Sequence, residues 1–118
     1  MLYAILAYHK EAEVLSWTAE ADAALMADLR KVHERINRDG RLGPAARLGA
    51  TKKARTLRGP GAGLVVDGPF AETKEQLAGF YILDCENLDE ALEWAAKIPT
   101  GCQGGAGLVE VRPLRQMP

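Results

Sequence analysis

Apolar residues occupy both alternating faces of the first stretch of the chain, from Leu2 to Tyr8. Successive side chains of a strand point to opposite faces, so the even-numbered residues share one face and the odd-numbered residues share the other. The pattern therefore predicts a first strand that is apolar on both sides. Helices would cover one side, and the second apolar side favours a partner subunit as its cover, so we expect a homodimer.

A helical period follows between Thr18 and Asp39. Apolar residues recur there at steps of three or four, which is the spacing of one helix face. These positions are Leu25, Leu29, Val32 and Ile36. Gly40 is a typical helix stop, so the sequence predicts a helix that ends before it.

The rest of the pattern predicts a hairpin, two strands and a second helix. A short strand at 54–58 could pair with 64–66 across a glycine turn, and the aromatic and branched run at 79–85 predicts a longer strand. Asn87, with Glu90 three residues later, predicts a capped helix start, and Pro99 and Gly101 predict its end. A last strand is expected at 108–112. The order β-α-β-hairpin-β-α-β fits a single domain over residues 1–118.

Composition limits the class of protein. The chain has 118 residues, 47% of them hydrophobic, and no apolar run approaches the ~20 residues of a membrane span. The first strand is too short for the apolar part of a signal peptide, so we expect a cytoplasmic protein with no membrane association. Cys85 and Cys102 have no metal-type spacing, which favours reduced thiols.

Charge is unevenly distributed along the chain. Between Arg30 and Arg58 there are ten Lys or Arg and two acids, so this segment carries +8 while the whole chain carries −1. The segment could attract anions, or it could be a solvated helix and loop balanced by the acidic remainder. It contains no aromatic residue that could stack on a base, which argues against a nucleic-acid partner.

Ionisable residues are densest at 67–75, which reads Asp-Gly-Pro-Phe-Ala-Glu-Thr-Lys-Glu. Asp67 could close an Asx-type turn, or it could serve as a general base at the rim of a cleft. Glu72 and Lys74 could form a surface turn, or they could bind an anionic substrate. Phe70 is apolar beside these charges, so we expect it to be buried and to anchor the loop.

This nine-residue stretch resembles the signature of the DGPF proteins, a branch of the YCII-related families. The resemblance also covers residues 2–8, 79–83, 89–95 and 109–113. It implies a ferredoxin-like α+β fold of the dimeric α/β-barrel type, with an antiparallel sheet and two helices on one face. Some members are encoded beside extracytoplasmic-function sigma factors, so the resemblance also implies a functional link to such a factor.

His33 lies in a stretch that resembles the one carrying the proposed active-site histidine of the wider YCII-like proteins. Those proteins pair that histidine with an aspartate after the second helix, where this chain has no carboxylate at 97–100. Asp67 could take that role, so we expect His33 and Asp67 to lie within one side chain or one water of each other. The alternative is a half-buried helix histidine with one hydrogen bond. His9 is expected to be an exposed strand end.

Glu110 and Arg112 share one face of the last predicted strand. They could pair with each other, or Arg112 could bind a carboxylate or phosphate in the cleft. The spacing of histidines and cysteines predicts no metal site, no Ser or Cys lies in a nucleophile-elbow pattern, and we expect no cofactor.

Two classes of function remain, and whether the chain is an enzyme stays open. The first is a small-molecule enzyme of general acid–base type, a lyase or isomerase acting on a small anionic substrate through His33 and Asp67, with Lys74 or Arg112 binding the anion. The second is a non-catalytic ligand-binding or regulatory module linked to a sigma factor.

Overall fold

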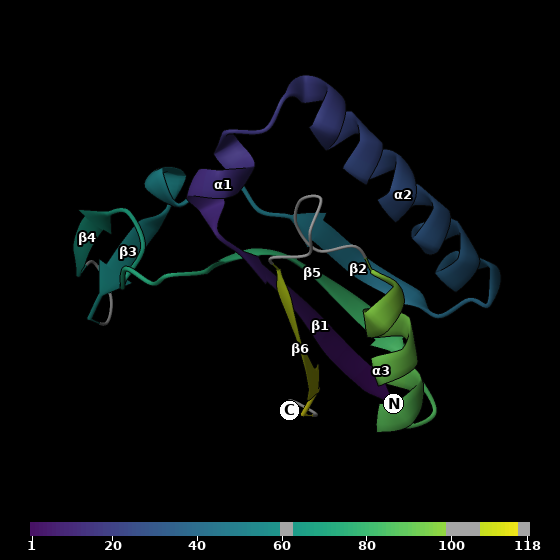
Figure 1. Ribbon diagram of the computed structural model, residues 1–118. Coiled ribbons are helices and arrows are strands. Elements are labelled where there is room, and N and C mark those ends of the chain that lie inside the picture. Colours follow the sequence, from purple (N-terminus) through teal and green to yellow (C-terminus); the bar gives the residue numbers. More distant parts are fainter. Residues whose placement is uncertain (60–62, 99–106, 116–118) are drawn as a thin grey trace.

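The computed structural model describes residues 1–59, 63–98 and 107–115. Its main element is a four-stranded antiparallel sheet in the order β2-β5-β1-β6 (Figure 1). The strands are β1 (Leu2–His9), β2 (Leu42–Arg47), β5 (Gln76–Asp84) and β6 (Leu108–Pro113). With a helix between the first two strands and another between the last two, this order is that of a ferredoxin-like α+β fold.

The long helices begin at side-chain caps that the sequence provides. In α2 (Ala19–Arg38), the Thr18 hydroxyl accepts a hydrogen bond from the amide of Ala21, at 3.1 Å. In α3 (Leu88–Lys97), the Asn87 side chain accepts from the amide of Glu90, at 2.9 Å. Both predicted helix starts are confirmed. The predicted end of the second helix at Pro99 and Gly101 lies outside the described residues.

Both long helices cover the same face of the sheet. The side chains that β1 and β5 turn toward them are buried, and Ile5 and Leu83 have no exposed surface. From the helices, Ile36 of α2 and Ala91 of α3 complete this core, also without exposed surface. Ile36, the last residue of the predicted apolar helix stripe, therefore belongs to the fully buried core.

The other face of the sheet carries few buried side chains. Leu6 lies opposite Phe80, and Ala4 lies opposite Ile82, and all four are only partly buried. Leu2 and Leu108 are 49% and 56% exposed. These residues form the open face of the sheet, as the two-sided apolar pattern of the first strand predicts.

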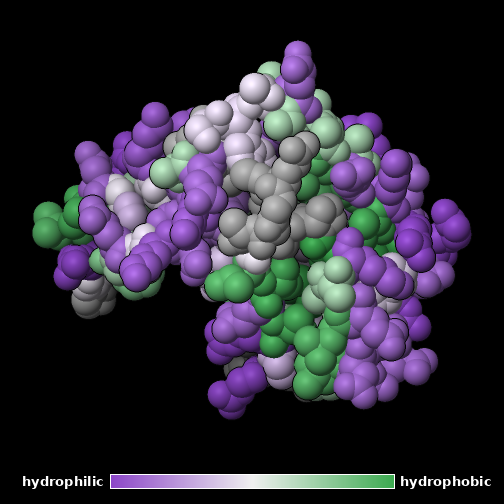
Figure 2. Space-filling model, viewed as in Figure 1, coloured by the Kyte–Doolittle hydropathy of each residue, from purple (hydrophilic) through white to green (hydrophobic). Residues whose placement is uncertain are grey.

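A second, two-stranded sheet stands apart from the first. It is the hairpin of β3 (Arg55–Arg58) and β4 (Leu64–Asp67), which Figure 1 shows beyond the end of the main sheet. The pairing of these strands is confirmed. We call the hairpin and the signature residues that follow it, 55–59 and 63–75, the arm. Exposed apolar side chains of the hairpin form the hydrophobic area at the far left of Figure 2.

Glu11 fixes the base of the arm. It begins α1 (Glu11–Leu15), and its carboxylate accepts hydrogen bonds from the amide of Thr51, at 3.1 and 3.2 Å, and from its hydroxyl, at 3.0 Å. Thr51 begins the short 3-10 helix η1 (Thr51–Lys53), just before β3. The amide of Glu11 also donates to the side chain of Gln76, the first residue of β5, at 2.8 Å. Three segments that are distant in sequence thus meet at one carboxylate-bearing residue.

The sequence pattern does not predict α1, η1 or β2. Gly43 and Pro44 are turn signals, yet they lie within β2, where the register with β5 shifts between Leu42 and Ala45. A bulge at an edge strand tolerates the missing N–H of proline, so the same residues serve a strand here.

Candidate functional site

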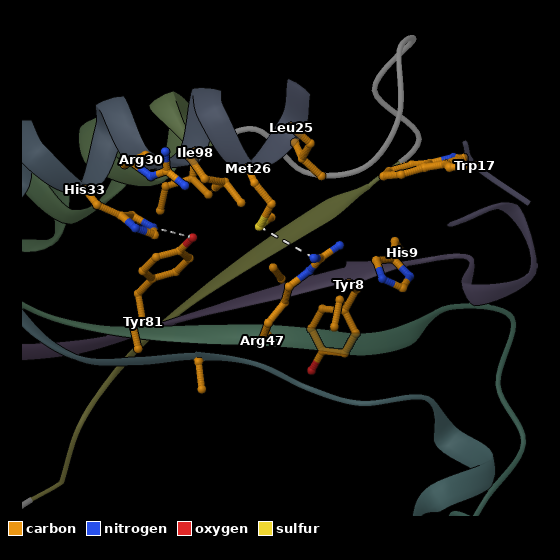
Figure 3. A pocket seen from close by; sticks show the side chains of 16 residues that line it. Tyr8, His9, Trp17, Leu25, Met26, Arg30, His33, Arg47, Tyr81 and Ile98 are labelled. Carbon is orange, nitrogen blue, oxygen red and sulfur yellow. Dashed lines mark hydrogen bonds between the residues drawn. The ribbon is translucent and has the colours of Figure 1, made fainter. Parts of the chain in front are cut away.

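A cavity of about 430 Å³ lies between α2 and the helix-covered face of the sheet (Figure 3). Its size falls within the range of ~300–1,000 Å³ that is usual for small-molecule sites. Most of its wall is apolar, with Leu25 and Leu29 from α2, Ala45 from β2 and Ala78 from β5. Polar side chains enter this wall at a few points, and they define what the cavity can do.

His33 and Tyr81 meet in this cavity. His33 Nε2 lies 2.9 Å from the hydroxyl oxygen of Tyr81, and the two rings are edge to face, with centroids 5.1 Å apart and planes at 64°. His33 is placed by α2, one position beyond the apolar stripe, and Tyr81 is placed by β5, where it is 8% exposed. The pair therefore joins the helix layer to the sheet layer.

Burial favours the uncharged form of both members of this pair. It lowers the pKa of His33 from its ordinary 6.5. It also raises the pKa of Tyr81 above its ordinary 10.0, and the nearby charge of Arg47 opposes that rise. At neutral pH the pair is thus a neutral imidazole hydrogen-bonded to a neutral phenol. Such an imidazole can accept a proton, and the phenol can donate one.

Arg47 lines the same wall and forms a second polar pair with Asp22 of α2, which does not itself line the cavity. Arg47 projects from β2 toward α2, where Nη1 donates to one oxygen of the Asp22 carboxylate at 3.3 Å and Nη2 pairs with the other. Nη1 also contacts the sulfur of Met26 at 3.5 Å, the interaction drawn as a dashed line in Figure 3. The hydrogen bond from Arg47 lowers the pKa of Asp22, so this carboxylate is ionised at neutral pH.

Two further polar atoms of the wall have no hydrogen-bond partner within the described part of the chain. They are Nδ1 of His9 and Nε1 of Trp17, and both atoms are buried. A buried polar atom without a partner is costly, so a water or a ligand group is expected to satisfy each of them. The expectation that His9 is an exposed strand end is wrong, because its side chain is half-buried and lines the cavity.

The family model of the YCII-related domain matches residues 1–118. The chain belongs to the YCII-related family. It is also 49% identical over 115 residues to an uncharacterized protein of Rhizobium meliloti (strain 1021), an alignment that covers 97% of this chain and 92% of the relative. The identification through the 67–75 signature and its flanking segments is thus confirmed at the level of the YCII-related family.

The YCII-related fold of this chain does not bring His33 and Asp67 together. Asp67 ends β4 in the arm, its side chain is 88% exposed, and its carboxylate lies 3.1 Å from Nε of Arg55. It does not line the cavity that His33 lines. Within one chain the expected contact between the two residues is therefore wrong, because the arm is a separate sheet rather than a part of the cavity wall.

The other signature residues also lie outside this cavity. Glu72 is exposed, and Lys74 is an exposed residue at a shallow depression near Glu11 and Thr51. Phe70 is 81% exposed, so the expectation that it is the buried anchor of the loop is wrong for the single chain. A hydrogen bond closes the turn instead, in which the hydroxyl of Thr56 donates to the carbonyl oxygen of Gly68 at 2.9 Å.

Glu110 and Arg112 both belong to the open face of the sheet. In the register of β6 against β1 they lie opposite Leu6 and Ala4, and Arg112 is exposed. Both residues are described, and no ion pair joins them. Arg112 is thus on the side of the sheet away from the cavity, which excludes it from the site that His33 occupies within one chain.

Sequence reasoning missed most of the polar residues of this wall. Tyr81 is part of an apolar strand run, and Arg47 stands alone in an edge strand, as its partner Asp22 does in a helix, so no local motif marks them. Over residues 1–59, 63–98 and 107–115 there is no group of three or more His, Cys, Asp or Glu that could hold a metal ion. The same ranges contain no helix with the length and apolarity needed to cross a membrane.

Proposed function

We propose that this YCII-related protein binds a small, largely apolar anionic molecule in the cavity and acts on it by general acid–base chemistry. One observation carries the proposal: a neutral histidine and a neutral tyrosine share a hydrogen bond of 2.9 Å in the wall of a small-molecule-sized cavity. Two hydrogen-bonded groups that titrate far apart are a common arrangement for proton transfer.

The direction of proton transfer follows from the two pKa shifts. His33, with its lowered pKa, is unprotonated at neutral pH and can remove a proton from a bound molecule. Tyr81, with its raised pKa, keeps its proton and can donate a hydrogen bond or a proton to an oxygen that gains negative charge. Removal of a proton beside a carbonyl group fits this arrangement, so an isomerase or lyase reaction is the class that we propose.

A ligand-binding or regulatory module without turnover is the second candidate. It is favoured by the mainly apolar wall and by the pairing of Arg47 with Asp22, which offsets one of the two arginine charges in the lining. A functional link to a sigma factor, which the family resemblance implies, belongs to this candidate.

We also propose that the protein is a cytoplasmic homodimer that joins two copies through the open face of the sheet. The support is the partly exposed apolar surface around Leu6 and Phe80. In Leu6→Glu, a charge in this surface should shift sedimentation at micromolar concentration from dimer to monomer. Leu92→Glu, at a 48% exposed leucine of α3, is the matched control and should stay dimeric. A wild-type protein that sediments as a monomer would remove this part of the proposal.

Hydrogen–deuterium exchange of substrate protons tests the acid–base function directly. A panel of small oxo-carboxylic acids is incubated with the protein in deuterated water, and deuterium uptake beside the carbonyl is read by mass spectrometry. We expect uptake with wild type, loss of about 100-fold or more in His33→Gln, and a smaller loss in Tyr81→Phe. Glu34→Gln, an exposed neighbour of His33 on α2, should exchange like wild type.

Other outcomes separate the alternatives. Binding without deuterium uptake would favour the module over the enzyme. Loss of uptake in Asp67→Asn, with normal folding, would mean that the signature aspartate reaches the cavity across a dimer, and it would restore Asp67, Glu72 and Lys74 as site residues. Uptake that survives in His33→Gln would contradict the proposed base.

A further inference from the structure

The guanidinium of Arg47 already binds one carboxylate, that of Asp22. Its two terminal nitrogens face the two oxygens of Asp22, one at 3.3 Å and one closer. This is the two-point arrangement in which a guanidinium binds any free carboxylate, and it is more specific than a contact to a single charge. Asp22 thus shows, within the chain, which chemical group the cavity wall of β2 can recognise.

The Arg47–Asp22 pair is exposed enough for another carboxylate to replace Asp22. The side chains of Arg47 and Asp22 are 49% and 39% exposed, so water screens their attraction. Asp22 lies near the start of α2, and an exposed side chain there can turn into solvent without disturbing the core. The only further neighbour of the guanidinium among the described hydrogen-bond partners is the sulfur of Met26, which is a weak acceptor.

An apolar space adjoins the guanidinium. Leu25, Met26 and Leu29 line the same cavity as Arg47, with Met26 beside the guanidinium, and His33 and Tyr81 line it farther along α2 and β5 (Figure 3). A molecule held at Arg47 by a carboxylate would therefore place an apolar body against these side chains and could extend toward the His33–Tyr81 pair.

We propose that Arg47 binds the carboxylate of a mainly apolar carboxylic acid, and that Asp22 is the internal carboxylate which this ligand displaces. The inference rests on the proposed small-molecule function of the cavity and names its substrate class. Because Asp22 competes for the same nitrogens, it sets the affinity for every carboxylate ligand, and its removal should strengthen binding rather than weaken it.

The test compares octanoate with octanamide, which have the same apolar chain and differ in charge. Binding is followed by the indole N–H signal of Trp17 in ¹H–¹⁵N NMR spectra, since Trp17 lines the cavity, and Trp94→Phe assigns the two indole signals. We expect wild type to bind octanoate more tightly than octanamide, and Arg47→Gln to lose most of this preference, with Arg30 left as the other arginine of the lining. In Asp22→Asn the affinity for octanoate should rise about tenfold while that for octanamide stays unchanged.

Asp28→Asn provides the matched control. Asp28 is an exposed acid of the same helix and does not line the cavity, so this variant removes the same charge without touching Arg47. A rise in octanoate affinity of similar size in Asp28→Asn would overturn the displacement, because general electrostatics would then explain the effect. So would an octanoate affinity that falls or is unchanged in Asp22→Asn.

The two proposals fail differently in this experiment. Equal binding of octanoate and octanamide by wild type would overturn the role of Arg47 while leaving a cavity that binds small molecules. An unmoved Trp17 signal with both probes, in wild type and in Asp22→Asn, would overturn the inference and would also count against the cavity as a site for apolar ligands.

Discussion

The arm and the cavity differ in how they are built from the sequence. The arm is continuous, since its signature is nine successive residues, and its side chains are largely exposed, with Phe70 at 81% and the Asp67 side chain at 88%. The cavity collects single residues from distant elements, such as His9, His33 and Tyr81, and buries part of each. The continuous motif therefore identifies the family, while the hydrogen-bonded pair suited to acid–base chemistry lies in the cavity, away from the motif.

The largest expected contrast between the two regions is in stability. Leu83→Ala removes a fully buried side chain from the core, which should lower the free energy of unfolding by about 2–5 kcal/mol. Phe70→Ala, in the arm, should change it by less than about 0.5 kcal/mol if the chain is alone. Urea denaturation compares both variants in a Leu6→Glu background, which should be monomeric if the proposed dimer forms through the open face. A Phe70→Ala loss near that of Leu83→Ala would mean that the arm packs as a core element.

A smaller effect is expected at the base of the arm. Glu11→Ala removes the acceptor of the Thr51 amide and hydroxyl, which should cost about 1–3 kcal/mol and loosen the hairpin locally. Amide hydrogen exchange should therefore become faster in β3 and β4 than in β1. Glu13→Ala, at an exposed acid of the same short helix, is the control. Equal acceleration in β1 would show that Glu11 supports the whole fold rather than the arm.

The cavity, unlike the arm, should make the free energy of unfolding depend on pH near neutrality. Burial lowers the pKa of His33 in the folded chain, so the unfolded chain takes up the proton first as the pH falls below about 6.5. The contribution of His33 to the free energy of unfolding is fully present above that pH. It is lost as the pH falls through the pKa that His33 has in the folded chain. The urea midpoint should thus drop between about pH 7.5 and pH 5, and less so in His33→Gln. An identical drop in both proteins would contradict a buried, neutral His33.

The smallest effect is expected at the exposed ion pair of the arm. Asp67→Asn removes the contact with Arg55, and because both side chains are more than half exposed the free energy of unfolding should change by less than about 0.5 kcal/mol. Thermal denaturation at low and high salt checks this, with Arg55→Gln as the reciprocal variant. A loss comparable with that of Leu83→Ala would make Asp67 a structural residue and would remove it from any site.

The sequence predicts those parts of this fold that local patterns determine. The helix capped by Thr18, the helix capped by Asn87 and the strand pairing of the hairpin all follow from neighbours in the chain. The strand β2 was missed because Gly43 and Pro44 are turn residues in most contexts, and only its pairing with β5 makes it a strand. His33 was found through its resemblance, whereas Tyr81 was missed because a tyrosine in an apolar strand looks like any core residue.

Phe70 shows a second limit of prediction from local sequence, because there a local pattern predicts burial that does not occur. An aromatic residue among charges predicts burial only if the chain folds back over it, and here the turn is closed by Thr56 and Gly68 while the ring stays in solvent. The contact between His33 and Asp67 was wrong for a related reason. The expectation puts Asp67 in the place of the missing aspartate, whereas the hairpin that carries Asp67 is a sheet of its own.

Proline on the outer strands has a consequence for how the protein behaves when concentrated. In the described sheet, β2 and β6 are the edges, and they carry Pro44 and Pro113. Pro44 interrupts the row of amide donors along β2, and Pro113 ends the row of β6, so another chain cannot easily extend the sheet strand by strand. Growth into fibrils is thereby disfavoured, and copies that meet in a crowded solution are left with the faces of the molecule as surfaces for contact.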